Sequence, residues 1–171
     1  MNKKCTLIRK AKLEDLVTLK IFLPSEIPGF LEEVIKEFNN MEADWILAFD
    51  QGSEVGHLRI RWGGTKNTYA KQFVKKTPNI ECFGIKQEYQ SLGIGTKILK
   101  TAEELIKNHG YRLAGLSLEI TNAKAKEFYL KRGYNEWDHG IYKVEWEEIK
   151  NGKISKASTI NIYLIKNFNS N

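Results

Sequence analysis

Apolar residues recur along this chain with two periods, one typical of helices and one typical of strands. In the first third, a strand-like run over 5–10 precedes two segments, 13–20 and 30–38, whose apolar residues are spaced three or four apart. That spacing places them on one face of an amphipathic helix. Two strand-like runs follow at 45–49 and 55–62, and the polar turn between them predicts a hairpin.

The second half continues the alternation of strands and helices. A polar connection, with a short helix around 69–74, leads to a strand over 79–85. A single apolar stripe then predicts a helix over 96–109, and a strand over 113–120 precedes Asn122, which can cap the next helix. The order strand-helix-helix-strand-strand-strand-helix-strand-helix-strand predicts an α/β protein whose mixed sheet carries helices on both faces.

The C-terminal part adds further strands to this pattern. Apolar and polar residues alternate over 141–146, another strand is predicted over 159–165, and Asn151-Gly152 between them is a strong hairpin signal. We therefore expect an extended hairpin region at about 141–166. Its simplest role is to complete the sheet. Covering an acceptor site, or pairing with a second subunit as a homodimer through an exposed edge, are the alternatives.

A glycine loop lies between the strand over 79–85 and the helix that follows it. Its sequence is Gln90-Ser91-Leu92-Gly93-Ile94-Gly95. The first turn of a helix has backbone N–H groups without intrahelical partners, the macrodipole adds partial positive charge there, and glycines let a ligand approach the backbone closely. The loop is therefore suited to bind a phosphate. It lacks the Gly-Lys-Ser/Thr ending of a P-loop and the third glycine of a dinucleotide fingerprint.

Two motifs, in order, resemble those of the GNAT N-acetyltransferases. Gln90 begins a Q-x-x-G-x-G pattern like the acetyl-coenzyme A loop of that family, and the later segment Asn122-Ala123-Lys124-Ala125-Lys126-Glu127-Phe128-Tyr129-Leu130-Lys131-Arg132-Gly133-Tyr134 resembles its second motif. The resemblance covers about residues 5–139. It implies the GNAT acyl-CoA N-acyltransferase fold, with a central, mixed, mostly antiparallel sheet splayed between its fourth and fifth strands, here 79–85 and 113–120.

What the resemblance implies for function is acetyl transfer. Acetyl-CoA would enter the wedge between the splayed strands as co-substrate, without a metal, and a primary amine of a small-molecule or peptide acceptor would attack its thioester directly in a ternary complex. The identity of that acceptor stays open, because acceptor loops vary among relatives that share one cofactor site. A non-catalytic acyl-CoA sensor with the same fold, or a basic nucleic-acid-binding module, are the alternatives.

The resemblance also implies which residues bind the cofactor. Gly93 and Gly95 would let the pyrophosphate approach, and main-chain amides of the loop would donate to it. Many members carry a cation where this chain has Ser91-Leu92, so a possible positive charge is missing while the backbone cradle is kept. The implied cofactor-binding residues are Phe83, Gly84, Ile85, Gln90, Ser91, Leu92, Gly93, Ile94, Gly95, Thr96, Asn122 and Tyr129.

Three residues are candidates for the chemistry. Tyr129 lies two helical turns after Asn122, hence on roughly the same face, and by resemblance it would protonate the leaving thiolate; packing beside Phe128 is the alternative. An amine with a pKa of about 10.4 is deprotonated in roughly one molecule in a thousand at neutral pH, so a base is needed. Glu81 is the first candidate, because strict alternation would aim it with the strand residues next to the thioester, and His57 is the second. Both could be structural polar residues instead.

Composition and charge limit the remaining possibilities. The 171 residues, of which 42% are hydrophobic and 28% charged, fit one soluble globular domain over 1–171. No apolar run approaches the ~20 residues that span a bilayer, and no signal-peptide core follows the N-terminus, so we expect a cytoplasmic protein that does not bind membranes. Cys5 and Cys82 are expected to be buried, reduced thiols. The net charge of +6 fits an anionic cofactor, and the scattered lysines come without a nucleic-acid recognition motif.

Overall fold

The computed structural model describes residues 6–22 and 26–169, in which strands and helices alternate much as the pattern predicts. Cys5, predicted to begin the first strand and to carry a buried thiol, lies outside the described residues. A 3-10 turn over Leu13–Asp15 leads directly into the first α-helix. The α-helices are α1 (Leu16–Phe22), α2 (Phe30–Asn39), α3 (Thr68–Lys71), α4 (Ile94–Asn108) and α5 (Ala123–Leu130), and the strands are β1 (Thr6–Lys10), β2 (Ala43–Asp50), β3 (Ser53–Arg61), β4 (Asn79–Ile85), β5 (Leu113–Glu119), β6 (Asn135–Lys150) and β7 (Lys153–Asn167).

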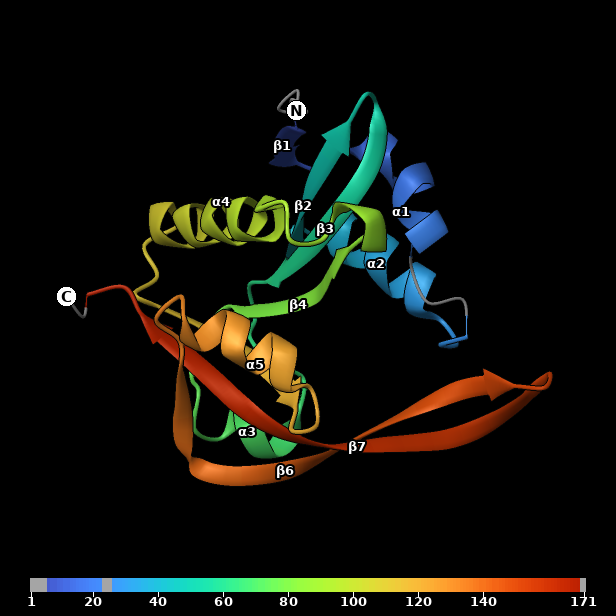
Figure 1. Cartoon of the computed structure of the whole chain (residues 1–171). Helices are drawn as coiled ribbons and strands as arrows, with labels where there is room; N and C mark the ends of the chain where they lie inside the picture. The colour runs from blue at the N-terminus through green and yellow to red at the C-terminus, as the bar shows by residue number, and fades with distance from the viewer. Residues whose placement is uncertain (1–5, 23–25, 170–171) are drawn as a thin grey trace.

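These strands form one mixed sheet, which confirms the predicted fold class. The described residues give a seven-stranded sheet in the order β1-β2-β3-β4-β5-β7-β6. All neighbours are antiparallel except β4 and β5, which are parallel and meet only where Asn79 pairs with Gly115. Beyond that pair the two strands separate, so the sheet is splayed between its fourth and fifth strands (Figure 1).

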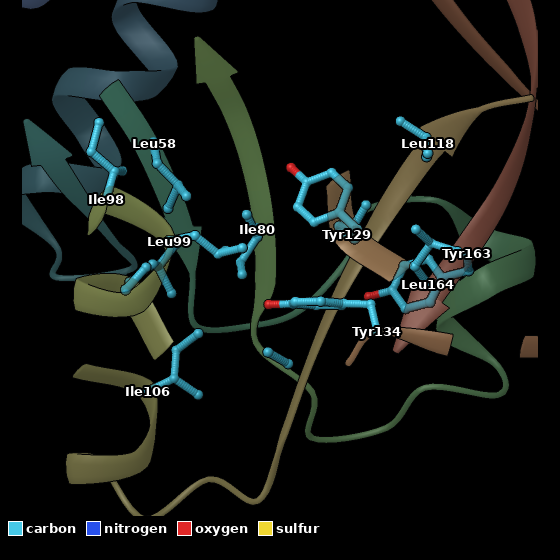
Figure 2. Packing of buried hydrophobic residues seen from close by; sticks show 14 of the residues in the cluster. Leu58, Ile80, Ile98, Leu99, Ile106, Leu118, Tyr129, Tyr134, Tyr163 and Leu164 are labelled. Atoms are coloured by element: carbon cyan, nitrogen blue, oxygen red, sulfur yellow. The ribbon is translucent and has the colours of Figure 1, made fainter. Parts of the chain in front are cut away.

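Helices cover both faces of this sheet. Successive side chains of a strand point to opposite faces, so a strand with apolar residues at consecutive positions needs packing partners on both. On β2, Trp45 and Leu47 pack with Leu19 of α1 and Val34 of α2 in one buried cluster. Residues 46 and 48 of the same strand belong to a second, larger cluster, which includes the buried side of α4 and continues to the far half of the sheet (Figure 2). The hydrophobic core therefore lies on both faces of the sheet, with α1 and α2 on one face and α4 on the other.

The helix after the glycine loop begins two residues earlier than predicted. Gly93, whose φ is +80°, is its N-cap residue, and Ile94 is already helical. No helix in the part of the chain that the structure describes is long and apolar enough to cross a membrane.

A β-bulge interrupts β4 in the middle of the strand. His57 of β3 pairs with Gly84, and Arg59 pairs with Glu81, so three residue steps on β4 face two on β3. Cys82, inside the bulge, has a φ of +47°, which is rare for a residue with a Cβ. The bulge reverses the alternation. The prediction that Glu81 points to the same side as Phe83 and Ile85 is therefore wrong: those two pack against the α4 side, whereas Glu81 reaches arginines and carboxylates on the α2 side.

The C-terminal hairpin is longer than the two predicted strands. Asn151 and Gly152, both with positive φ, form the two-residue turn between the paired residues Lys150 and Lys153. Residues 161–167 of β7 pair with β5 and so complete the sheet. Nearer the turn, the hairpin extends away from the sheet as an arm (Figure 1), and the N–H of Ile149 donates to the carbonyl of Glu26, just before α2, at 2.6 Å.

Candidate active site

A cavity of about 520 Å³ lies where β4 and β5 separate, between α4 and α5. Nine of the predicted cofactor-binding residues line it: Phe83, Ile85, Gln90, Ser91, Gly93, Gly95, Thr96, Asn122 and Tyr129. The other three lie around it. Leu92 is 57% exposed, Ile94 is buried in the main core, and Gly84 packs against His57 on β3. The two motifs therefore meet in space across the wedge.

The glycine loop turns sharply into α4 at the mouth of this cavity. Ser91 and Gly93 both have positive φ, which aims the chain back over the first turn of the helix. A Cβ on Gly95 would make an ordinary van der Waals contact with the ring of Phe83, at 3.4 Å, so a side chain at this position would project among the residues that line the cavity. Asn122, on the opposite wall, caps α5 through its side chain, whose Oδ1 accepts from the N–H of Ala125 at 3.1 Å.

Two cations on the opposite wall make up for the charge that the loop lacks. Lys124 donates from Nζ to the side-chain oxygen of Gln90 at 3.0 Å, and the Nε2 of Gln90 donates to the carbonyl of Ile85 at 3.1 Å. Arg132 donates to the hydroxyl of Thr96 at 2.6 Å and lies over the ring of Phe128. Sequence reasoning missed both cations, although each lies within the second motif, because motif spacing does not say which lysines of a helix face the wedge.

The chemistry of the lining fits an elongated anionic group. Lys124 and Arg132 are positively charged, and none of the described residues that line the cavity is a carboxylate. The amino end of a 15-residue helix adds its dipole to these charges. Farther in, the walls become aromatic through Phe83, Phe128 and Tyr129, so an apolar arm can follow a charged head. Within 6–22 and 26–169 no group of metal-binding side chains occurs.

Tyr129 lies at the inner end of the cavity with little exposure to solvent. It is 6% exposed and packs edge-on against Phe128 and Tyr134, and Figure 2 shows its hydroxyl in the gap between β4 and β5. Burial raises the pKa of this phenol well above its usual range, because the phenolate would be poorly solvated. The hydroxyl therefore keeps its proton at neutral pH and can donate it.

His57 lies on the other side of β4, with its ring against the strand. A Cβ on Gly84 would lie 2.9 Å from His57 Nε2, so glycine is what lets the imidazole approach the backbone there. The other nitrogen, Nδ1, lies 3.1 Å from a carboxylate oxygen of Glu54, a side chain that is 1% exposed. A buried carboxylate at Nδ1 orients the ring and favours the tautomer that leaves Nε2 as an acceptor.

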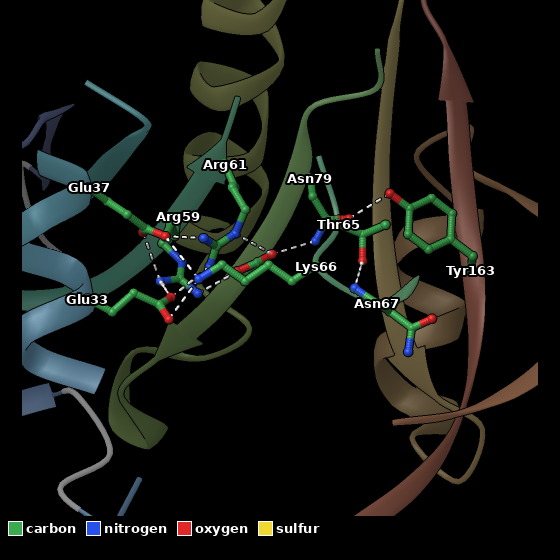
Figure 3. Close-up of polar contacts among 10 residues, drawn as sticks. Glu33, Glu37, Arg59, Arg61, Thr65, Lys66, Asn67, Asn79 and Tyr163 are labelled. Atoms are coloured by element: carbon green, nitrogen blue, oxygen red, sulfur yellow. Dashed lines mark hydrogen bonds and ion pairs between the residues drawn. The ribbon is translucent and has the colours of Figure 1, made fainter. Parts of the chain in front are cut away.

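Glu81 belongs to a buried ionic network on the α2 side of the sheet, together with the arginines and the α2 carboxylates that Figure 3 labels. Its Oε2 accepts from Arg59 at 2.5 Å and from Arg61 at 3.1 Å, and its Oε1 accepts from Arg61 and from Asn79. Burial alone would raise the pKa of this carboxyl, but the charge of Arg59 and the bonds from Arg61 and Asn79 outweigh it and lower the pKa. Glu33 and Glu37 of α2 bind the same two arginines.

Comparison with known proteins agrees with this geometry. The chain is 29% identical over 137 residues to an N-alpha-acetyltransferase of Sulfurisphaera tokodaii, a match that covers 75% of this chain and 80% of the relative. It is also similar to the crystal structure of a GNAT-family acetyltransferase of Staphylococcus aureus Mu50, at 16% identity and a TM-score of 0.68, covering 96% of this chain and 99% of that one.

A second similar structure is the PaiA N-acetyltransferase of Thermoplasma acidophilum in complex with coenzyme A, at 18% identity and a TM-score of 0.62, covering 95% of this chain and 99% of that one. At such identities the two structures show a shared fold. The model of the acetyltransferase (GNAT) family matches residues 16–134, which is well over half of the chain. The protein therefore belongs to the GNAT family and is an acetyl-CoA-dependent N-acetyltransferase.

Proposed function

We propose that this protein transfers the acetyl group of acetyl-CoA to a primary amine by direct attack within a ternary complex. One observation carries the proposal: the cavity in the splayed sheet has a positively charged mouth at the amino end of α4 and an aromatic interior that ends at a buried phenol. A charged mouth suits a diphosphate, and a narrow apolar slot suits the arm that carries the thioester.

Several parts of the chain would hold the cofactor. First-turn amides of α4, together with Lys124 and Arg132, would bind the diphosphate. Backbone groups of β4 at residues 83–85 would bind the arm and polarise the thioester carbonyl from the edge that faces β5, because the splay leaves that edge of β4 without a partner strand beyond Asn79. Acetyl-CoA supplies the acetyl group in activated form, and the protein supplies orientation and proton transfer.

Two side chains would handle the protons. Tyr129 would donate its phenolic proton to the departing sulfur, since burial keeps that hydroxyl protonated. His57 would accept the proton of the attacking amine at Nε2, with Glu54 holding the ring. Glu81 is the less suited of the two predicted bases, because four hydrogen bonds from cationic or amide donors occupy its carboxylate oxygens.

The acceptor class that we propose to test first is the α-amino group of a peptide. The support is the relative from Sulfurisphaera tokodaii, whose name specifies an N-alpha-acetyltransferase. The space for such an acceptor would be the α2 side of the wedge, where His57 lies and where the arm meets the segment before α2. A peptide could lie there in extended form with its amine pointing toward β4.

Calorimetry and product detection test this function together. We expect acetyl-CoA to bind with measurable heat, and we expect a panel of short peptides with free N-termini to release free thiol from it. His57→Gln should lower kcat by about 10²-fold, the size of a general-base contribution, while leaving the affinity for acetyl-CoA nearly unchanged. Absence of binding would end the proposal. Binding without product from any amine would instead identify a sensor of acyl-CoA.

A further inference from the structure

The strained point of the active site is Cys82, in the middle of β4. A φ of +47° brings the Cβ of a non-glycine residue too close to its own backbone, and such a conformation persists only where the surroundings enforce it. The register between β3 and β4 is regular up to the pair of Arg59 with Glu81 and shifts immediately afterwards. Whatever fixes Glu81 therefore fixes the last regular residue before the strained one.

Glu81 is fixed from three directions. Arg59 and Arg61, whose side chains are 4% and 8% exposed, hold both of its oxygens from β3. Each arginine also forms ion pairs with Glu33 and Glu37 of α2, and Lys66 pairs with Glu33 at the exposed edge of the network (Figure 3). Together with Glu81, three carboxylates therefore surround two buried guanidinium groups. Rotation of the Glu81 carboxylate would break its hydrogen bonds with Arg59, Arg61 and Asn79 together, which is costly because both guanidinium groups are buried.

The third set of contacts connects Glu81 to β7, on the other side of the gap between β4 and β5. Asn79 donates from Nδ2 to Glu81 at 2.7 Å, and its Oδ1 accepts from the hydroxyl of Tyr163 on β7 at 2.6 Å. Tyr163 is fully buried and lies over Gly115, where a Cβ would come within 2.4 Å of its ring. Because Asn79 and Gly115 are the pair at which β4 and β5 part, this chain of contacts ties Glu81 to both walls of the wedge.

We propose that Glu81 is a positioning residue that enforces the bulge at Cys82. In that role it keeps the backbone groups of residues 83–85 aimed at the thioester carbonyl, and it never touches the reacting atoms. The inference rests on the proposed function. It differs from a role as general base, because a base acts through its own proton transfer, whereas a positioning residue can be replaced by anything else that stabilises the same backbone conformation.

The double-mutant cycle of Glu81 and Cys82 tests this inference. Glu81→Gln keeps the shape and removes the charge that holds the arginines. Cys82→Gly makes a positive φ inexpensive, since glycine has no Cβ. We expect Glu81→Gln to lower kcat/KM by at least about 10-fold, Cys82→Gly alone to change it by less than about 3-fold, and the double variant to recover most of the loss. The pH profile of kcat/KM should keep its midpoints in all three variants.

Ligand binding supplies a readout that is independent of turnover. Free CoA lacks the carbonyl that the bulge would orient, so Glu81→Gln should weaken acetyl-CoA by about 3-fold or more and leave the dissociation constant of CoA unchanged, as measured by calorimetry. Tyr163→Phe removes one hydroxyl from the same chain of contacts, and it should shift the ratio of the two constants in the same direction by a smaller factor. It serves as the second variant if Glu81→Gln folds poorly. Glu33→Gln, on α2, should change the ratio of the dissociation constants of acetyl-CoA and CoA less than either of these two variants.

Three results would overturn the inference. Cys82→Gly could fail to restore activity, Glu81→Gln could remove one limb of the pH profile as loss of a base does, or the variants at 81 and 163 could weaken CoA and acetyl-CoA equally. If the unaltered protein binds neither ligand, the proposed function fails and this inference fails with it. If the unaltered protein binds both and only the cycle disagrees, the function stands and the assignment of Glu81 is wrong.

Discussion

At the scale of single residues, Tyr129 and His57 lie on opposite sides of one strand, and their environments differ as their proposed tasks require. Tyr129 sits among aromatic rings, where burial raises its pKa and keeps it a proton donor. His57 touches the backbone at Gly84 and is oriented by the carboxylate of Glu54. A donor on the sulfur side and an acceptor on the amine side are what direct transfer between two bound substrates needs.

Tyr129→Phe should separate chemistry from binding. The phenylalanine keeps the ring contacts but has no proton to give, so we expect kcat to fall by about 10²-fold or more while the dissociation constant of acetyl-CoA stays within about 2-fold. The rate of thiol release gives kcat, and calorimetry gives the dissociation constant of acetyl-CoA. Tyr134→Phe is the matched control, because its buried ring packs edge-on against Tyr129 but is not among the residues that line the cavity. Equal losses in both variants would show that packing, and not the hydroxyl, accounts for the effect.

At the scale of elements, α5 and the turn after it place Lys124 and Arg132 at the cavity, where they would supply the positive charge that the glycine loop lacks. Lys124→Ala should weaken acetyl-CoA by about 3- to 10-fold, as expected for the loss of one solvent-exposed phosphate contact, and raising the salt concentration should reduce the difference between variant and parent. An acetylated pantetheine without the diphosphate should bind both proteins alike. Lys131→Ala, at the C-cap of the same helix and paired with Glu127 outside the cavity, should bind acetyl-CoA like the parent. An unchanged affinity for Lys124→Ala would leave the backbone amides as the main anion site.

The anchoring of α2 on β3 should make stability depend on pH in a defined direction. Burial alone would raise the pKa of Glu33, but bonds from Lys66 and Arg61 outweigh it and lower the pKa from an ordinary 4.5 to about 2. A depressed folded pKa contributes stability that is complete above pH 4.5 and is lost as the pH falls toward 2. Since the side chain is about one-third exposed, we expect only roughly 1 kcal/mol from it. Urea unfolding between pH 2 and 6 measures this effect: the free energy of unfolding should depend less steeply on pH in Glu33→Gln than in the parent.

The helices α4 and α5 and the strand β4 show which features of the fold could be predicted from the sequence and which could not. Apolar periodicity and the Asn122 cap were sufficient to place α4 to within two residues and the start of α5, because these signals are local, whereas the splay was predicted from the resemblance to the GNAT family. The bulge at Cys82 has no local signal: a cysteine is an ordinary strand residue, and the contacts that we propose to enforce its positive φ, those of Glu81, come from residues distant in sequence. Strict alternation therefore put Glu81 on the wrong side of the strand, and no pattern showed that Arg59 and Arg61 would meet it.

At the scale of the whole molecule, the arm formed by β6 and β7 stands apart from the cofactor cavity. Residues 161–167 complete the sheet beside β5, whereas the distal part of β7 pairs only with β6 among the described strands. Its tip meets the segment before α2 through the bond from Ile149 to Glu26, on the side of the wedge where His57 lies. In the proposed function, one half of the molecule would therefore hold the acetyl donor, while the arm and α2 would frame the approach of the acceptor.

Shortening the arm should impair use of the acceptor and leave donor binding intact. Removing residues 145–150 and 153–158 brings the Asn151-Gly152 turn directly after Val144, which pairs with Thr159, and the even shift keeps every remaining side chain on its original face. We expect a folded protein with an unchanged dissociation constant for acetyl-CoA and a KM for peptide amines raised about 10-fold or more. Sedimentation velocity on the same variant also tests the predicted homodimer, because a fall in mass relative to the parent would place the subunit contact on the arm. Unaltered acceptor kinetics would mean that the amine reaches His57 by another route and that the arm only extends the sheet.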